Sequence, residues 1–372
     1  MHWPYCARKC PYCDFNSHVR GHMPEAEWLE GILAELEHEA SLTAGQTLTS
    51  IFFGGGTPSL MTPASAGAII DRAAALWRAA PKLEITLEAN PSTVEAERFS
   101  GFRKAGINRV SLGLQALNDA DLSALGRTHD AATGIAALDM AQAHFPRVSF
   151  DLIYTREGQS AADWERELRR ALSFGTEHLS LYQLTIEPGT HFATRHAAGD
   201  LILPAEDPAA DMFEMTRAIT AEAGLPAYET SNYARPGAES RHNLTYWRYG
   251  DYAGVGPGAH GRRAGRATVR TRLPERWLSR LAERGAVPAT EERIAPGKAA
   301  TEALMMGLRL TEGIDAARFQ VRTGVPLADA IDTEAAARLQ AYGLLSWTGK
   351  TLRLTEPGHA VLNSILVDLI PN

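Results

Sequence analysis

Short apolar runs alternate with amphipathic stretches over the first half of this 372-residue chain. The apolar runs, which are rich in β-branched and aromatic residues, are Thr47–Phe53, Leu83–Leu87, Arg109–Leu114, Val148–Tyr154 and His178–Leu184. The helical stretches between them include Glu25–Glu39, Ala64–Trp77, Val94–Ala105 and Asp163–Ser173. Such alternation predicts parallel strands joined by right-handed crossovers. With a sixth strand expected just before Cys6, the sequence predicts an α/β fold built on a partial (β/α)6, TIM-like barrel.

Polar and glycine residues follow the predicted strands at the point where each one ends. They are Gly54–Thr57, Glu88–Pro91, Gln115, Asp151 and Gln183. In parallel barrels the active site lies at the carboxyl ends of the strands, so these residues are candidates for one site at one rim. Polar strand ends also occur simply because loops begin there, which explains one or two of these positions better than the whole series.

The second half of the chain does not continue the alternation of strands and helices. Residues 204–261 are less regular and rich in Gly, Tyr and Asn, and Ala286–Gly297 is typical of a linker. Beyond it we expect helices at Lys298–Leu310, Asp315–Thr323, Leu327–Tyr342 and Glu356–Leu369. We also expect a hairpin in which Leu344–Trp347 and Leu352–Leu354 flank a turn at Thr348-Gly349-Lys350. This order predicts a C-terminal winged-helix-like α+β domain. We therefore expect a barrel domain over 1–285, with an extension at about 204–261, and a second domain over 296–372.

Charge and hydropathy exclude some function classes. The net charge is −7, and the C-terminal helices mix acidic and basic residues without a basic stripe, so we expect no nucleic-acid partner. No apolar stretch is long enough to span a bilayer, and the N-terminus lacks the pattern of a secretory signal. These features predict a cytoplasmic protein, with peripheral membrane contact left open.

The three cysteines of the chain all lie within its first thirteen residues, as Cys6, Cys10 and Cys13. An odd, tight cluster indicates a metal site rather than a disulfide framework. Three thiolates can hold a cubane iron–sulfur cluster and leave one of its four irons open to another ligand. A structural zinc site is the alternative, with His2 or His18 as the fourth ligand.

The spacing CxxxCxxC, with the aromatic Tyr12 before the last cysteine, resembles the hallmark of the radical S-adenosylmethionine (radical SAM) superfamily. The flanking residues His2–Cys6 and Cys10–Phe15 are similar to the oxygen-independent coproporphyrinogen III oxidase-like branch, and within it to the HemW-type heme chaperones. The similarity continues through Gly54–Ser59, Glu88–Pro91, Ser111–Gln115, Gly126–His129, Ser149–Tyr154, Tyr182–Gly189 and Arg241–Trp247. It covers nearly the whole chain.

The resemblance implies a role for each matching residue. Cys6, Cys10 and Cys13 would ligate a [4Fe-4S] cluster, and Tyr12 would lie beside the adenine of S-adenosylmethionine (SAM). Contacts to SAM are also implied for Gly55, Gly56 and Thr57 (methionine end), Glu88 (ribose or amino group), Gln115 and Arg127 (polar groups, including the carboxylate) and Asp151 (ribose hydroxyls). Taken singly, the glycines could form only a tight turn, the carboxylates could be surface residues or helix caps, and Arg127 could be an ordinary ion-pair partner.

Two features separate the subfamilies. The coproporphyrinogen dehydrogenases carry an extra cysteine two residues after the third ligand, where this chain has Phe15. The segment His242–Trp247 resembles the HNxxYW motif associated with heme binding, which implies heme contacts for His242, Tyr246 and Trp247. His260 is a second candidate, and either histidine could instead be an ordinary loop residue.

The resemblance thus implies a heme chaperone that holds a [4Fe-4S] cluster and SAM, binds heme, and passes it to heme-accepting proteins, with an electron donor for the cluster. The alternative is an oxygen-independent coproporphyrinogen III oxidase of porphyrin biosynthesis, whose activity is disfavoured by Phe15.

The chain departs from the family pattern at two places. Relatives carry an aromatic residue upstream of His2, so either a cofactor contact is missing or the natural start lies before Met1. Residues 155–158 read Thr-Arg-Glu-Gly where relatives usually have Gly-Leu-Pro-Gly. The second departure predicts a changed loop beside Asp151.

Overall fold

Six parallel strands form the main sheet of the computed structural model, which describes residues 1–21 and 23–371. The sheet order is β1-β4-β5-β6-β7-β8-β9, and only β9 is antiparallel to its neighbour. Its strands are β1 (His2–Trp3), β4 (Thr47–Gly55), β5 (Arg78–Ala89), β6 (Arg109–Gln115), β7 (Arg147–Tyr154), β8 (His178–Gln183) and β9 (Asn232–Ala234). This order confirms the predicted α/β fold and the strand expected before Cys6.

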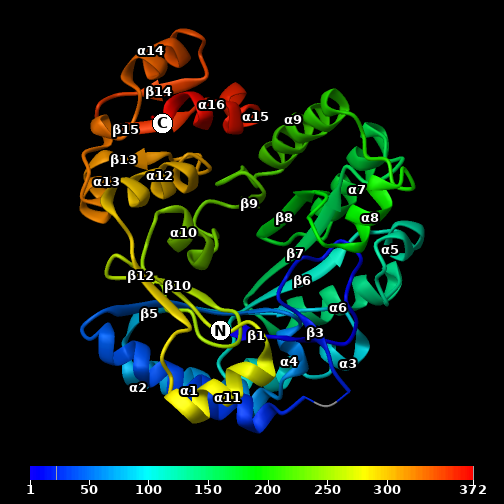
Figure 1. The fold of residues 1–372 in the computed structure, drawn as a ribbon. Coiled ribbons are helices and arrows are strands. Elements are labelled where there is room, and N and C mark those ends of the chain that lie inside the picture. Colours follow the sequence, from blue (N-terminus) through cyan, green and yellow to red (C-terminus); the bar gives the residue numbers. More distant parts are fainter. Residues whose placement is uncertain (22, 372) are drawn as a thin grey trace.

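Helices cover the outer side of the curved sheet, and α10 lies on its open side (Figure 1). The helices of this half are α1 (Glu25–Leu42), α2 (Pro63–Leu76), α3 (Thr93–Ala96), α4 (Phe99–Lys104), α5 (Asp119–Ala124), α6 (Ala131–His144), α7 (Ala161–Ser173), α8 (His191–Ala197), α9 (Glu206–Glu222), α10 (Arg241–Trp247) and α11 (Pro274–Arg284), with the 3₁₀ turn η1 (Pro58–Leu60). Local capping starts several of them. For example, Ser160 and Asp163 form a reciprocal capping box at the start of α7.

Two small sheets complete this half of the chain. The pair β2 (Tyr5–Cys6) and β3 (His18–Val19) closes the cysteine loop at its base. The second sheet contains β10 (His260–Arg263), β11 (Arg266–Val269) and β12 (Thr290–Arg293).

Buried ion pairs attach this second sheet to α1. Arg263 Nε lies 2.5 Å from Glu39 Oε2, and Arg270 Nη2 lies 2.7 Å from Glu39 Oε1. Glu39 is fully buried, and the exposed fraction of both arginine side chains is below 5%. The sheet is therefore held by charges that have no access to water.

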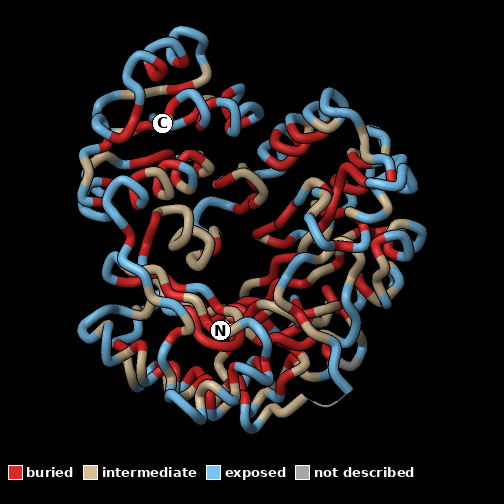
Figure 2. Tube along the Cα trace, in the orientation of Figure 1, coloured by how far each residue is buried: buried red, intermediate tan, exposed pale blue. Residues whose placement is uncertain are grey.

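The C-terminal part has its own hydrophobic core, which includes Leu304, Leu308, Leu352, Ile365 and Leu369. Its elements are α12 (Pro296–Gly307), β13 (Ile314–Asp315), α13 (Ala316–Thr323), η2 (Leu327–Asp329), α14 (Thr333–Ala341), β14 (Leu345–Trp347), β15 (Thr351–Leu354), α15 (Glu356–Ala360) and α16 (Leu362–Leu369). The hairpin β14–β15 lies beside β13 in a three-stranded sheet, as a winged-helix-like domain requires. Figure 2 shows buried residues along the strands of both parts. We propose that the two cores correspond to the two domains expected from the sequence.

Several sequence-based element predictions were wrong in detail. The region 204–261, predicted to be irregular, contains the 17-residue helix α9. The predicted linker Ala286–Gly297 contains strand β12, which pairs with β11. Three stretches predicted as single helices are divided, into α3 and α4, η2 and α14, and α15 and α16.

Candidate cofactor and ligand site

The three cysteines lie on one loop at the carboxyl end of the barrel. Cys6 ends β2, and the backbone N–H of Cys13 donates to the carbonyl of Cys10 at 3.2 Å. All three thiols are free and half-buried. Burial raises the pKa of Cys6 and Cys13, so their thiolates need a positive partner such as a metal to be stable at neutral pH.

A chain of hydrogen bonds joins Cys6 to Cys10 across the barrel rim. Thr57 Oγ1 donates to Cys6 Sγ at 3.4 Å, and Asn90 Nδ2 donates to Thr57 Oγ1 at 2.9 Å. Arg127 then donates from Nη2 to Asn90 Oδ1 at 2.6 Å and from Nη1 to Cys10 Sγ at 3.3 Å. Residues from the ends of β4 and β5 and from the segment after α5 therefore meet at the cysteine loop. Asn90 belongs to the strand-end candidates Glu88–Pro91 predicted from the sequence, but the family resemblance assigned it no cofactor contact.

Gly55 and Gly56 let the N-terminal strand approach closely. The N–H of Gly56 donates to the Trp3 carbonyl at 2.7 Å, and the N–H of Thr57 donates to the Tyr5 carbonyl at 2.8 Å. A Cβ atom at position 56 would lie 2.5 Å from the Tyr5 oxygen, and Gly55 has a φ of +114°. Side chains there would displace the cysteine loop.

Two carboxylates face the barrel interior below this rim. Gly55 N–H donates to Glu88 Oε2 at 3.3 Å, and Ser111 Oγ donates to Asp151 Oδ1 at 3.3 Å. Desolvation raises the pKa of Glu88 to about 7, and the charge of Asp151 adds to this effect. Desolvation also raises the pKa of Asp151 to about 6. Carboxylates that lack water in this way gain from hydroxyl or amino donors of a ligand.

The remaining predicted contacts surround the same loop. Tyr12 packs near Phe192, with ring centroids 6.1 Å apart. Burial raises the pKa of Tyr12, and the nearby Arg127 guanidinium opposes this effect. Gln115 has a left-handed backbone, with φ +71°, and its amide lies close to Gly113. Arg127 also donates to the Gly113 carbonyl at 2.9 Å, whereas its buried Nε has no partner among the described residues. That unsatisfied donor, the two carboxylates with raised pKa values and the three thiols suit a polar ligand bound to a cluster.

The described residues do not provide a complete ligand set for a single zinc ion, which was the alternative to a cluster. Within the described part of the chain, no three His, Cys, Asp or Glu side chains converge on one ion position. His18 Nε2 is hydrogen-bonded to Asn16 Oδ1 at 3.2 Å instead. Thiolates of a cubane each bind a different iron, so they need not converge on one point.

A cavity of about 910 Å³ lies beside α10 and extends along β4 to Leu36 of α1 and to Trp77. Gly55 and Glu88 line it, and so do His242, Tyr246 and His260. Trp247 does not line this cavity, and faces the C-terminal part in a small hollow shared with Gly307 and Ile314. The structure thus brings two of the three predicted heme residues together beside the predicted SAM residues, and places Trp247 elsewhere.

The His242 ring is held by aromatic neighbours. It stacks on Phe52 with centroids 4.1 Å apart and meets Tyr246 edge-on at 4.7 Å. Desolvation lowers the pKa of His242 to about 3, so the imidazole is neutral at physiological pH. Its ring forms no hydrogen bond with any side chain or backbone group of residues 1–21 and 23–371. A neutral imidazole is the form that binds a metal.

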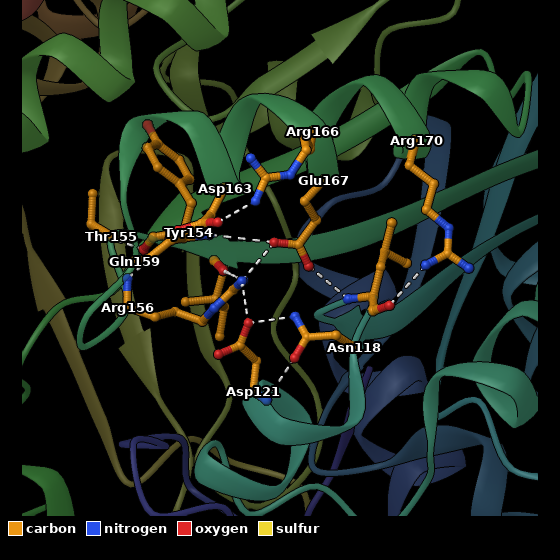
Figure 3. A network of polar contacts seen from close by, with 12 residues as sticks. Asn118, Asp121, Tyr154, Thr155, Arg156, Gln159, Asp163, Arg166, Glu167 and Arg170 are labelled. Atoms are coloured by element: carbon orange, nitrogen blue, oxygen red, sulfur yellow. Dashed lines mark hydrogen bonds and ion pairs between the residues drawn. The ribbon is translucent and has the colours of Figure 1, made fainter.

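The unusual loop after β7 is supported by a network of polar contacts (Figure 3). Thr155 has a φ of +57°, which a glycine would adopt without strain, and its hydroxyl donates to the Tyr154 carbonyl at 2.6 Å. Arg156 Nη2 contacts Glu167 Oε2 at 2.6 Å and Asp121 Oδ2 at 2.7 Å. Glu167 Oε1 accepts from the Leu117 N–H at 2.7 Å. The network ties the loop beside Asp151 to the connection that follows Gln115.

Removing the Arg156 side chain should destabilise the protein strongly. Arg156→Ala leaves Glu167, of which 8% is exposed, without its buried cation, and this costs about 3 kcal/mol. Arg166→Ala is the matched control, because that arginine is 72% exposed in its ion pair with Asp163 and its loss costs about 0.5 kcal/mol or less. Denaturant unfolding followed by tryptophan fluorescence measures both. Equal losses of unfolding free energy in the two variants would show that burial of the Arg156–Glu167 pair does not contribute to stability.

Comparisons with known proteins agree with this geometry. Residues 1–171 match the model of the radical SAM superfamily, and residues 294–361 match the HemN C-terminal domain. A solved structure described as coproporphyrinogen III oxidase (HemN) from Escherichia coli, a radical SAM enzyme, covers 98% of this chain and 88% of its own with a TM-score of 0.81. Its sequence identity is 21%, so this likeness concerns the fold. The barrel and the cysteine loop define a radical SAM protein.

Curated relatives show to which branch of the superfamily the chain belongs. A mitochondrial radical S-adenosyl methionine domain-containing protein 1 from Bos taurus is 38% identical over the whole of this chain and 86% of its own length. The heme chaperone HemW of Escherichia coli (strain K12) is 37% identical over 98% of this chain and 96% of its own length. The chain belongs to the HemW-type branch of the radical SAM superfamily. Its cofactors are accordingly a [4Fe-4S] cluster and SAM.

A helix that crosses a bilayer must be both long and apolar. Within residues 1–21 and 23–371, no helix is both long enough and apolar enough to cross a membrane.

Proposed function

We propose that this protein is a heme chaperone, which binds heme in the cavity beside α10 and transfers it to acceptor proteins. One observation carries the proposal: the same cavity is lined by Glu88 and Gly55 of the predicted SAM site and by His242 and Tyr246 of the predicted heme site. The aromatic residues that line it near α10, which include Phe52, Tyr246 and Tyr252, suit a large planar ligand. The HemW relatives are named as heme chaperones, which supports this choice.

The residues of the rim have assigned roles in this proposal. Cys6, Cys10 and Cys13 would hold the cluster, whose reductive activation of SAM is the chemistry that these cofactors supply when bound. Tyr12, Gln115 and Asp151 would orient SAM, together with Gly55, Gly56, Thr57 and Glu88. Arg127 hydrogen-bonds to Cys10 Sγ, so it would place a positive charge between the cluster and the carboxylate of SAM.

The cellular setting follows from the same chemistry. Thiols that hold a cluster must stay reduced, so we place the protein in the cytoplasm. An electron donor for the cluster is part of the proposal. Peripheral membrane contact stays a prediction, and so does a heme contact for Trp247.

Hemin titration of wild type and His242→Ala tests heme binding. We expect the Soret band to change position in the variant and the affinity to fall at least tenfold, or about 1.4 kcal/mol, because iron loses a neutral imidazole ligand. His144→Ala is the control, since that histidine is exposed at the end of α6. An unchanged spectrum and an unchanged affinity in His242→Ala would show that His242 does not bind the heme iron.

Oxidative decarboxylation of a porphyrinogen is the second candidate function, favoured by the likeness of the fold to HemN. Phe15 argues against it, because it stands where the dehydrogenases carry the extra cysteine, and its side chain is 60% exposed and lines the cavity. An anaerobic assay with reductant and SAM decides between the two. Conversion of propionate to vinyl side chains would establish the enzyme.

A further inference from the structure

The cavity beside α10 has two walls built by segments far apart in sequence. One wall is α10, with His242 and Tyr246, and the other includes the N-terminal residues, His260 of β10, and Arg272, which follows β11. The walls meet at Tyr252, whose ring centroid lies 4.2 Å from that of Tyr246 and whose backbone pairs with Arg262 of β10. In Figure 1, α10 lies on one side of this region, and β10 and the N-terminus lie on the other. A planar ligand between the walls would present one face to each.

His242 can occupy only one of the two axial positions of a heme iron. Its ring is fixed on the α10 side by Phe52 and Tyr246, at centroid distances of 4.1 and 4.7 Å. An iron bound there keeps its second axial position on the side of the opposite wall. That wall therefore decides whether the iron has five or six ligands.

His260 is the exposed histidine of the opposite wall. Its imidazole forms no hydrogen bond or ion pair with any residue in the described ranges, so both ring nitrogens are available. Its backbone is fixed nevertheless. A Cβ atom at Gly254 would lie 1.9 Å from the His260 carbonyl oxygen, and the N–H of Arg270 donates to the Ala259 carbonyl at 2.8 Å.

Buried charges hold the backbone before His260 in place. The N–H of Gly256 donates to Glu35 Oε2 at 2.7 Å, and Arg270 Nη1 lies 3.3 Å from Glu35 Oε1. Gly258, with φ +79°, packs so closely on Asn16 that an added Cβ atom would lie 2.2 Å from its amide nitrogen. The wall is thus rigid in its backbone while the His260 side chain is free to bind.

Arg272 supplies a positive charge on the same wall. Its side chain is exposed, lines the cavity and forms no ion pair within the part of the chain that the structure describes. Its backbone is held because Asn16 Nδ2 donates to its carbonyl at 2.9 Å. Heme is apolar in its ring and anionic at its two propionates, which matches the exposed Phe15 and the guanidinium of Arg272 on one rim.

We propose that His260 is the second axial ligand of the bound heme iron, opposite His242, and that Arg272 binds a heme propionate. The proposal rests on the heme-binding function proposed above. It assigns the heme to a slot between α10 and the sheet β10–β11.

Hemin titration of the full chain, followed by absorbance and electron paramagnetic resonance, tests this assignment. Wild type should give a six-coordinate, low-spin ferric spectrum. His260→Ala should give a high-spin spectrum with at least tenfold weaker binding, and added imidazole should restore the low-spin state. Arg272→Gln should stay low-spin and bind about threefold to tenfold more weakly, because only a charge-assisted contact is lost.

The outcomes separate this inference from the proposed function. His144→Ala should match wild type in every measurement, since that side chain is exposed on α6, which contributes nothing to the cavity. A low-spin spectrum of unchanged affinity in His260→Ala overturns the second ligand while heme binding stands. Unchanged affinity in Arg272→Gln overturns the propionate contact. Absence of saturable hemin binding by wild type would overturn the heme-chaperone function itself.

Discussion

Cys10→Ser should abolish the iron–sulfur cluster. Cys10 is one of three thiols available to hold a cubane, and Arg127 already donates to its sulfur at 3.3 Å. A serine hydroxyl is a poor substitute for a thiolate, so the variant should lose nearly all cluster iron and its charge-transfer absorption after anaerobic reconstitution. Iron analysis and the visible spectrum measure this loss.

The matched control for Cys10→Ser is Arg8→Ala on the same loop. The Arg8 side chain is exposed and forms no ion pair within the described residues, so this variant should retain a full cluster. Full iron content in Cys10→Ser would show that the cluster has other ligands. A colourless wild type that holds zinc after reconstitution would favour the zinc alternative instead.

Glu39→Ala should lower the stability of the fold more than Arg156→Ala does. Glu39 is fully buried and joins Arg263 and Arg270, so its removal breaks two buried ion pairs at once. Arg263 then keeps only Glu291, and Arg270 keeps only Glu35, as ion-pair partners among the described residues. The loss of both pairs should cost about 3–5 kcal/mol. Because these arginines hold the sheet β10–β11 against α1, the heme wall should loosen as well.

Glu37→Ala on the same helix is the control for Glu39→Ala. Glu37 pairs with Arg72 at the surface, with 54% of its side chain exposed, so its loss should change stability by about 0.5 kcal/mol or less. Chemical denaturation of both variants gives the comparison. Similar midpoints for Glu37→Ala and Glu39→Ala would contradict the role given to the buried network.

The sequence predicted the parallel sheet well because each strand has a local apolar signal. Segments such as Arg109–Gln115 and Arg147–Tyr154 are buried along most of their length, so their hydropathy alone marks them. Strand β12 has the sequence Thr-Glu-Glu-Arg, which carries no such signal, and it is a strand only because it pairs with β11. Helix α9 was missed because its buried face includes the polar residues Thr216, Arg217 and Thr220, which interrupt the apolar period.

The sequence predicted which residues form the site, but it could not predict the contacts between them. The cysteine spacing and the polar strand ends are local features, whereas the bond from Arg127 to Cys10 joins residues 117 positions apart. The stacking of His242 on Phe52 also depends on the tertiary fold, as does the burial that lowers the pKa of that imidazole to about 3. Trp247 belongs to the same short helix as His242, yet helical geometry turns it toward the C-terminal part.

Electron paramagnetic resonance of the reconstituted, reduced protein tests the central claim most directly. A cluster held by Cys6, Cys10 and Cys13 has one iron open to an outside ligand. We predict a reduced [4Fe-4S] signal whose shape changes when SAM is added, because the amino and carboxylate groups of SAM bind that iron. A cluster signal that is indifferent to SAM, or no cluster at all, would contradict the account.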